Sequence, residues 1–135
     1  MKSGRFVFPI LIFFCVQLVH SQEATKKPGF FVMHQNKVAM ANVAKLNTYV
    51  DSVFAPVLNE LVKEGKLLGW GQLDHSWGDE WNVNFYFLTE NHRAFLDFWS
   101  EYNNRLNKRF PGWAAKIVPL LSEHKDNMYV IRTMQ

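Results

Sequence analysis

The chain has 135 residues, of which 48% are hydrophobic and 20% charged, and its formal net charge is +3. This length suits one domain with a hydrophobic core of its own. Two of the 15 basic residues, Lys2 and Arg5, lie in an acid-free segment that we expect to be removed, so the rest of the chain is nearly neutral. A nearly neutral chain argues against general binding of nucleic acid, which requires a net basic surface.

Residues 1–21 have the three-part pattern of a secretory signal peptide. Two basic residues precede an apolar run over 6–19, and Val19 and Ser21 occupy the −3 and −1 positions of a cleavage site after Ser21. The run is shorter than the roughly 18–20 residues that span a bilayer. We therefore expect a secreted or periplasmic protein with no stable membrane anchor after cleavage; retention of the segment as an anchor is the alternative.

The only cysteine, Cys15, lies in this segment, so residues 22–135 lack both disulfides and thiolate chemistry. The chain also has no Asn-x-Ser/Thr acceptor for glycans. Export without disulfides or glycans favours a bacterial protein. We expect 22–29 to be a flexible leader and 30–135 to form a single domain.

The domain begins with a β-rich segment over 30–40, which predicts a strand. Apolar residues then recur at helical spacing over 43–64, and Gly65 is suited to end that helix. Pro56 lies inside the helix and removes one backbone hydrogen bond. We therefore expect a kink between Ser52 and Pro56.

Segments 66–75 and 81–88 flank a turn with Gly and Asp, which predicts a β-hairpin. A second helix is expected over 90–109, beginning after Thr89, with its basic residues over 103–109 near the favourable end of the helix dipole. The rest of the chain predicts a short helix over 113–122, a turn over 124–127 and a last strand over 128–134.

The resulting order, β-α-β-β-α-(α)-β, predicts an α+β fold of the ferredoxin-like type with one four-stranded antiparallel sheet. Its helices would cover one face of the sheet. The other face would carry aromatic side chains, and exposed patches of that kind usually mark an interface. We therefore predict a homodimer in which two sheets pack face to face.

Residues 54–87, FAPVLNELVKEGKLLGWGQLDHSWGDEWNVNFYF, resemble the middle of the dimeric α+β barrel superfamily, and are most similar to small exported bacterial members of unknown function. The shared features are a Pro-kinked helix, a Gly-Lys entry into the second strand, a Gly-Trp-Gly strand, an acidic hairpin and an aromatic third strand. The resemblance covers about residues 30–133 and implies a site between the helices and the sheet of one subunit. The superfamily includes cofactor-free monooxygenases, haem-degrading enzymes, haem peroxidases and cyclases, so the fold alone does not choose an activity.

Haem-degrading members use an Asn on the first strand, a Trp near the end of the third, and a His in the following helix. Asn36 and His92 match two of these positions, but the third strand ends with Tyr86 and Phe87. His92 also lies early in its helix, so a surface position is the alternative interpretation. His34 offers a general base or an iron ligand, or else a hydrogen-bonded imidazole in the dimer interface.

Four further residues are candidates for ligand binding. Trp70 lies between two glycines, which leaves room for a ligand or for a partner chain. Asn82, Asn84 and Tyr86 form a row of donors and acceptors. By the resemblance this row suits an electron-rich substrate of cofactor-free oxygenation, while structural use at the dimer interface is the alternative.

Nothing in the sequence predicts a metal site or another cofactor. Asp74 and His75 are neighbours in a strand and therefore point to opposite faces. The chain has no HExxH, CxxC or phosphate-binding glycine loop.

Three hypotheses follow. The first is a small-molecule-binding dimeric barrel, whose enzymatic form is a cofactor-free monooxygenase-like enzyme on an aromatic compound. The second is a haem-binding or haem-degrading protein that uses His34 or His92, and the third is a non-catalytic exported homodimer. Open space between helices and sheet favours the first, whereas space filled by Phe54, Phe95 and Trp99 favours the third.

Overall fold

The computed structural model describes residues 26–75 and 80–133. The predicted signal peptide, residues 22–25 of the predicted leader and residues 76–79 of the predicted turn lie outside these ranges. Within them, no helix has both the length and the apolar character needed to cross a bilayer.

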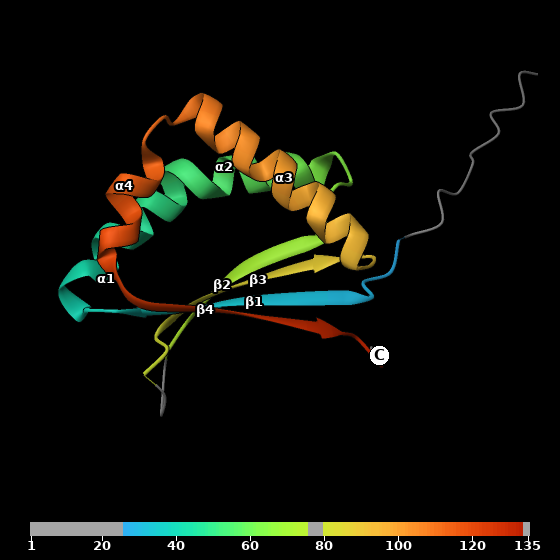
Figure 1. Cartoon of the computed structure of the whole chain (residues 1–135), viewed down its shortest axis with the longest axis horizontal. Coiled ribbons are helices and arrows are strands. Elements are labelled where there is room, and N and C mark those ends of the chain that lie inside the picture. The colour runs from blue at the N-terminus through green and yellow to red at the C-terminus, as the bar shows by residue number, and fades with distance from the viewer. Residues whose placement is uncertain (1–25, 76–79, 134–135) are drawn as a thin grey trace, which may run out of the picture.

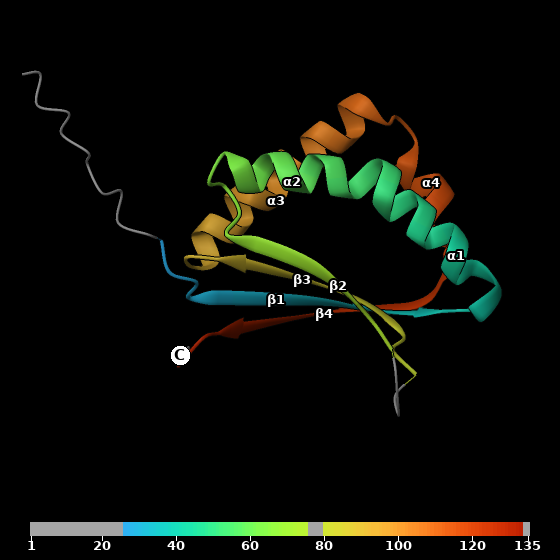
Figure 2. The same ribbon diagram turned by 180° about the vertical axis from the view of Figure 1, so that it is seen from behind.

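One antiparallel sheet organises the described residues. It contains β1 (Phe30–Val38), β2 (Gly69–Asp74), β3 (Val83–Thr89) and β4 (Leu121–Val130) in the order β2-β3-β1-β4. The helices lie on one face of the sheet, and no other described helix or strand covers the opposite face, as the two opposite views show (Figures 1 and 2). The predicted ferredoxin-like α+β fold is confirmed.

The first helical stretch is continuous but irregular in its middle. It consists of α1 (Met40–Tyr49), a π-helical segment (Val50–Phe54) and α2 (Ala55–Lys63). Pro56, the second residue of α2, has no N–H to donate, and the N–H of Ala55 bonds to the carbonyl of Val50, five residues back. The irregular segment thus lies where the sequence predicts a kink. The helix begins at Met40, three residues before its predicted start.

The second long helix, α3 (His92–Arg109), begins two residues later than predicted. Its cap is Asn91, whose side chain accepts a hydrogen bond from the N–H of Ala94 at 2.9 Å. Thr89, after which the helix was expected to begin, is the last residue of β3.

Basic residues near the end of α3 pair with glutamates at the end of α2. The guanidinium of Arg105 donates two hydrogen bonds to the carboxylate of Glu64, at 2.8 and 2.7 Å. Arg109 binds Glu60 in the same two-point manner, with both distances 2.6 Å. These pairs join the two helices, and they give Arg105 and Arg109, two of the basic residues over 103–109, a structural role.

The end of the chain differs from the prediction. After α4 (Trp113–Ile117) and a 3-10 turn (Val118–Leu120), β4 already begins at Leu121. The expected turn over 124–127 is therefore wrong, because Lys125 and Asn127 pair with β1. Residues 124–127 are polar on both faces of the strand, as an exposed edge strand can be. They therefore lack the alternation of apolar and polar residues from which a strand is recognised in a sequence.

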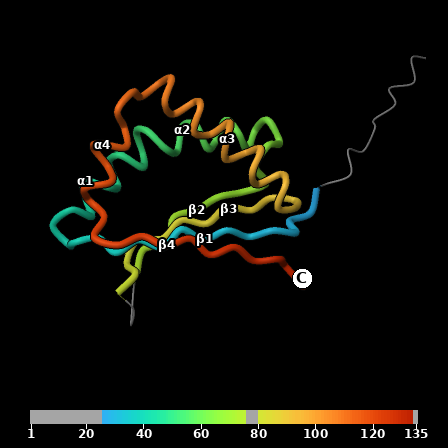
Figure 3. Tube along the Cα trace, in the orientation of Figure 1, coloured from blue at the N-terminus to red at the C-terminus, as the bar shows by residue number. Residues whose placement is uncertain are grey.

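The core fills most of the layer between helices and sheet. Side chains of β1, β3, α2 and α3 form its larger part, and burying each large apolar side chain contributes about 1.5–3 kcal/mol. A second group lies where α1 and α4 converge over one end of the sheet (Figure 3). It comprises Val38, Leu46, Val50, Val83, Ile117 and Leu120.

Candidate functional site

A cavity of about 400 Å³ lies between the helices and the sheet, beside the core. Six aromatic side chains line it: Phe54, Phe85, Phe87, Trp99, Tyr102 and Trp113. Phe54 and Trp99 are thus walls of the space and do not fill it, while Phe95 is buried in the core. Phe54 is the last residue of the π-helical segment, so the irregularity before Pro56 helps to shape this wall.

Four polar side chains form one corner of the cavity: His34 and Asn36 from β1, and His124 and Asp126 from β4. Within each strand the two residues are two positions apart, so both side chains lie on the same face. In the antiparallel pairing His34 lies opposite Asp126, and Asn36 lies opposite His124. The sheet register alone therefore brings the four groups together.

Asn36 sets the orientation of His124. Its side-chain Nδ2 donates a hydrogen bond to the carbonyl of Val83 at 2.9 Å, which turns Oδ1 toward His124. Nδ1 of His124 lies 2.7 Å from that Oδ1 and donates to it, because an amide oxygen only accepts. The other ring nitrogen, Nε2, lies 3.0 Å from Oδ1 of Asp126.

His34 is held among aromatic rings. Its side chain is 11% exposed, and its ring meets the rings of Phe87 and Trp99 edge-on at centroid distances of 5.0 and 4.9 Å. Nε2 of His34 lies 3.4 Å from the same Oδ1 of Asp126. Burial lowers the pKa of His34, the nearby carboxylate of Asp126 opposes this effect, and His124 lowers the pKa further.

Trp70 and His92 lie outside the cavity wall. Trp70 packs against the core, and its Nε1 donates a hydrogen bond to Oδ1 of Asn59 at 3.0 Å. His92, the first residue of α3, is exposed, and its ring lies 5.2 Å from that of Phe30.

Asn82 and Asn84 bond to the backbone at the end of the sheet. Oδ1 of Asn82 accepts from the N–H of Val38, and its Nδ2 donates to the carbonyl of the same residue, both at 2.8 Å. Asn84 accepts from the N–H of Asn36 at 3.3 Å and donates to the carbonyl of Trp81 at 2.9 Å. Both side chains extend the pairing of β1 with β3 and are not part of the cavity wall.

Tyr86 belongs to the opposite, uncovered face of the sheet. Its ring stacks on that of Phe31 at 6.0 Å, and Phe31 also meets Tyr129 at 5.9 Å. The ring of Tyr86 covers Gly71, where an added Cβ would lie 2.5 Å from the ring atom Cε1. Of the seven predicted site residues, only His34 and Asn36 line the cavity.

Half of the polar corner is absent from the residues that the sequence predicts for a site. The sequence predicts a turn over 124–127 that contains His124 and Asp126, and it offers Trp99 only as a side chain that could fill the space between helices and sheet. Once 121–130 is known to be a strand, the spacing of two places Ser122, His124 and Asp126 on one face. That spacing is the signal in the sequence that leads to them.

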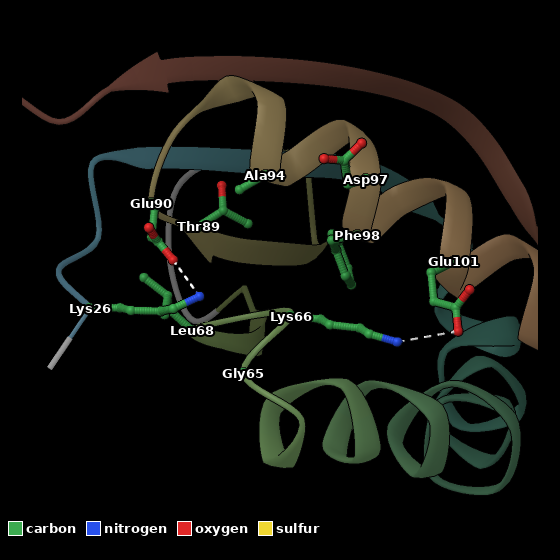
Figure 4. A pocket seen from close by; sticks show the side chains of 10 residues that line it. All are labelled: Lys26, Gly65, Lys66, Leu68, Thr89, Glu90, Ala94, Asp97, Phe98 and Glu101. Carbon is green, nitrogen blue, oxygen red and sulfur yellow. Dashed lines mark ion pairs between the residues drawn. The ribbon is translucent and has the colours of Figure 1, made fainter. Parts of the chain in front are cut away.

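A second hollow, of about 420 Å³, lies between the end of α2 and the start of α3 (Figure 4). Its charged side chains form ion pairs, with Lys26 bound to Glu90 at 2.7 Å and Lys66 to Glu101 at 3.5 Å. Since these charges neutralise each other, we assign no function to this hollow.

No protein-family model matches the sequence, and no curated protein is significantly similar to it. Solved structures, in contrast, match well. A dimeric ferredoxin-like protein from an uncultured marine organism has a TM-score of 0.66 at 11% identity, over 82% of this chain and 94% of that one. A NIPSNAP domain protein from Burkholderia xenovorans, described as uncharacterized, has a TM-score of 0.56 at 14% identity, over 78% and 97% of the two chains.

The chain has the ferredoxin-like α+β fold of these solved structures. This confirms, at the level of fold, the resemblance found in residues 54–87. A further match with the same fold is a mutant form of SnoaB, a cofactor-independent oxygenase from Streptomyces nogalater, with a TM-score of 0.52. It is 14% identical, and the match covers 80% of this chain and 97% of SnoaB.

Proposed function

We propose that the protein binds a small aromatic compound in the cavity between its helices and sheet. One observation carries the proposal: aromatic side chains line a space of about 400 Å³ whose charged and amide side chains all belong to β1 and β4. Sites for small molecules typically combine apolar walls with a few polar groups that fix the orientation of the ligand. The walls favour a planar ring, and the corner favours a hydroxyl or carbonyl group on it.

The activity that we propose is oxygenation of an electron-rich aromatic compound. The likeness in fold to a cofactor-independent oxygenase supports this, and so does the aromatic cavity. In one such reaction a ring CH₂ becomes C=O, one atom of O₂ enters the product, and the other atom leaves as water with the two hydrogens. No external reductant is required, because the substrate supplies all the electrons.

Haem is a weaker proposal for this cavity. His92 lies outside the cavity wall, and Nε2 of His34 faces the carboxylate of Asp126 at 3.4 Å. The rings of Phe87 and Trp99 flank His34 and obstruct a porphyrin. We expect no shift of the Soret band when purified protein is titrated with haem; a shift that is lost in His34→Ala would contradict this expectation.

We also propose a homodimer that forms through the uncovered face of the sheet. The marine ferredoxin-like protein is described as dimeric, and the uncovered face here carries stacked aromatic rings. Leu73 and Tyr129 on this face are 44% and 50% exposed. A second copy would cover these side chains, and such a patch is unusual on a monomer.

Export of the protein remains a proposal that rests on residues 1–21. Expression of the full chain in a bacterium and fractionation of the cells test it. We expect the protein in the periplasm or medium with residue 22 as its first residue. Full-length protein in the cytoplasm or membrane fraction would contradict this expectation.

Fluorescence tests the binding proposal directly. Trp99 and Trp113 line the cavity, so a phenolic compound such as 1-naphthol should quench their emission in a saturable way. Ser122 also lines the cavity, and Ser122→Trp should narrow it and weaken binding. Ser100→Trp on the exposed face of α3 is the matched control, and equal affinity in both variants would overturn the proposed binding site.

Oxygenation is tested with an electrode for O₂ and with mass spectrometry. With an electron-rich substrate such as an anthrone, we expect consumption of O₂ above the uncatalysed rate and a product in which CH₂ is replaced by C=O. Saturable binding without catalysed O₂ consumption would refute the activity and favour a binding protein.

A further inference from the structure

We propose that His34, His124 and Asp126 bind a divalent transition-metal ion at the polar corner of the cavity. Such a site goes beyond the proposed function and does not depend on it, since its evidence is the arrangement of three side chains on β1 and β4. The sequence alone offers no metal motif, because the residues of β1 and β4 are far apart along the chain.

Two of the three distances between the donor atoms match the spacing that a single ion requires. One nitrogen of each histidine and one carboxylate oxygen lie within 4.8 Å of one another. The two distances to Oδ1 of Asp126 are 3.4 Å from Nε2 of His34 and 3.0 Å from Nε2 of His124. Ligands held about 2.1 Å from one ion at tetrahedral or octahedral angles are about 3.0–3.4 Å apart.

The hydrogen bonds around His124 leave its inner nitrogen available for an ion. Since Asn36 takes the hydrogen on Nδ1, Nε2 of the neutral ring carries a lone pair that faces the carboxylate of Asp126. Two lone pairs at 3.0 Å repel each other unless a cation lies between them. A proton on Nε2 would relieve this one contact, whereas a metal ion would satisfy both histidines and the carboxylate at once.

The surroundings of the ligands match those of known metal sites. A metal-binding histidine usually donates its second ring N–H to a carbonyl or carboxylate, as His124 does to Asn36. Asn36 is in turn fixed by the carbonyl of Val83. The second histidine, His34, is held by the rings of Phe87 and Trp99, so both imidazoles are positioned before an ion arrives.

Two imidazoles and one carboxylate indicate which ions to expect. This ligand set is typical of catalytic Zn²⁺ and of non-haem Fe²⁺, and in both cases further coordination positions stay open for water or substrate. All three ligands line the cavity, so the open positions would face the compound bound there.

Cobalt is a suitable probe because its visible absorption reports its ligands. Untagged protein, stripped with EDTA and dialysed, should bind about one Co²⁺ per chain, and Zn²⁺ should displace it. The three ligands come together in the folded chain but not in the unfolded chain, so binding of the ion should also raise the melting temperature. Under anaerobic conditions, Fe²⁺ is tested by its displacement of Co²⁺ and by the rise in melting temperature.

Three variants locate the site. His124→Ala and Asp126→Asn should abolish saturable binding, and Asn36→Ala should weaken it by about 10- to 100-fold because the orienting acceptor is lost. The matched controls are His92→Ala and Asp97→Asn, which change the same residue types on the exposed surface of α3. Circular dichroism of each variant checks that it is folded.

Absence of saturable binding of Co²⁺, Zn²⁺ and Fe²⁺ to wild-type protein would overturn the metal site. Binding that survives in both His124→Ala and Asp126→Asn would overturn it too. Quenching by 1-naphthol is measured separately on the stripped protein. If the stripped protein binds 1-naphthol but no metal, the proposed binding function stands and the metal site fails. If it binds metal but not 1-naphthol, the metal site stands and the proposed binding function fails.

Discussion

Asn36 and His124 face each other across β1 and β4, with Oδ1 of the amide 2.7 Å from Nδ1 of the imidazole. This contact fixes the hydrogen of a neutral His124 on Nδ1. Nitrogen-15 NMR of the histidine rings should therefore show His124 as the Nδ1-protonated tautomer in metal-free protein. Asn36→Leu should remove this preference and leave the signals of His92 unchanged; an Nε2-protonated His124 in the wild type would contradict the assigned contact.

The uncovered face of the sheet yields a prediction for the proposed dimer. Leu73→Glu and Tyr129→Glu place a charge on side chains that are half exposed in one chain but would be buried between two. A buried unpaired charge is strongly unfavourable, so both variants should be monomers at micromolar concentration by light scattering.

Leu96→Glu is the matched control for these variants. Leu96 is 46% exposed but belongs to α3, on the other side of the molecule, so the variant should stay a dimer. Wild-type protein that is already monomeric at micromolar concentration would refute the dimer.

Two glycines of β2 differ in the space around them. A Cβ at Gly71 would lie 2.5 Å from the ring of Tyr86, whereas a Cβ at Gly69 would lie 3.6 Å from the side chain of Leu88. Gly71→Ala should therefore displace Tyr86 from its stack on Phe31 and lower the free energy of unfolding by about 1–3 kcal/mol.

Gly69→Ala, with ordinary contact distances, is the control and should change stability much less. Urea denaturation measures both variants. If the ring of Tyr86 is the obstacle, Gly71→Ala should hardly change the free energy of unfolding when Tyr86 is also replaced by Ala. An equal loss of stability from Gly71→Ala in the wild type and in Tyr86→Ala would exclude this explanation.

The fold was predictable because its strongest signals are local. The helical spacing of apolar residues, Gly65 at the helix end and the position of Pro56 all mark elements without reference to the rest of the chain. The face of the sheet to which β3 side chains point also follows from alternation, as Val83 and Phe87 on the buried face show.

The site was only half predictable because it depends on register between distant strands. His34 was a candidate because an imidazole on the first strand can act as a base or an iron ligand, and Asn36 because the resemblance to haem-degrading members implied it. Their partners His124 and Asp126 lie in an edge strand without apolar alternation, so nothing local distinguishes that strand from a turn. The amide of Asn82 looked like a ligand group for a related reason: the sequence does not reveal that the backbone of Val38 binds it.

Acid should weaken the connection between α2 and α3. The hydrogen bonds from Arg105 to Glu64 are the main cause that lowers the pKa of Glu64 from 4.5 to about 2. Because the pKa is lower in the folded state, the carboxylate stabilises the fold fully above about pH 4.5, and this contribution is lost as the pH falls from there toward 2. The difference in urea midpoint between wild type and Glu64→Gln should therefore shrink as the pH falls from 4.5 toward 2, and a constant difference would contradict this assignment.

High salt should reduce the difference in urea midpoint between wild type and Glu64→Gln at neutral pH, because the ion pair is exposed.

The sequence suggested Trp70 as a ligand contact, but the structure places a different tryptophan, Trp99, at the cavity. Trp99 lines the cavity, whereas Trp70 packs against the core and bonds to Asn59. Trp99→Phe should remove much of the quenching by 1-naphthol and weaken its binding by about 2- to 10-fold, as expected for the loss of one favourable aromatic contact. Trp70→Phe should lower the total emission but leave the affinity and the amplitude of quenching unchanged. If Trp70→Phe abolishes the quenching and Trp99→Phe does not, the compound binds beside β2, and the cavity is not its site.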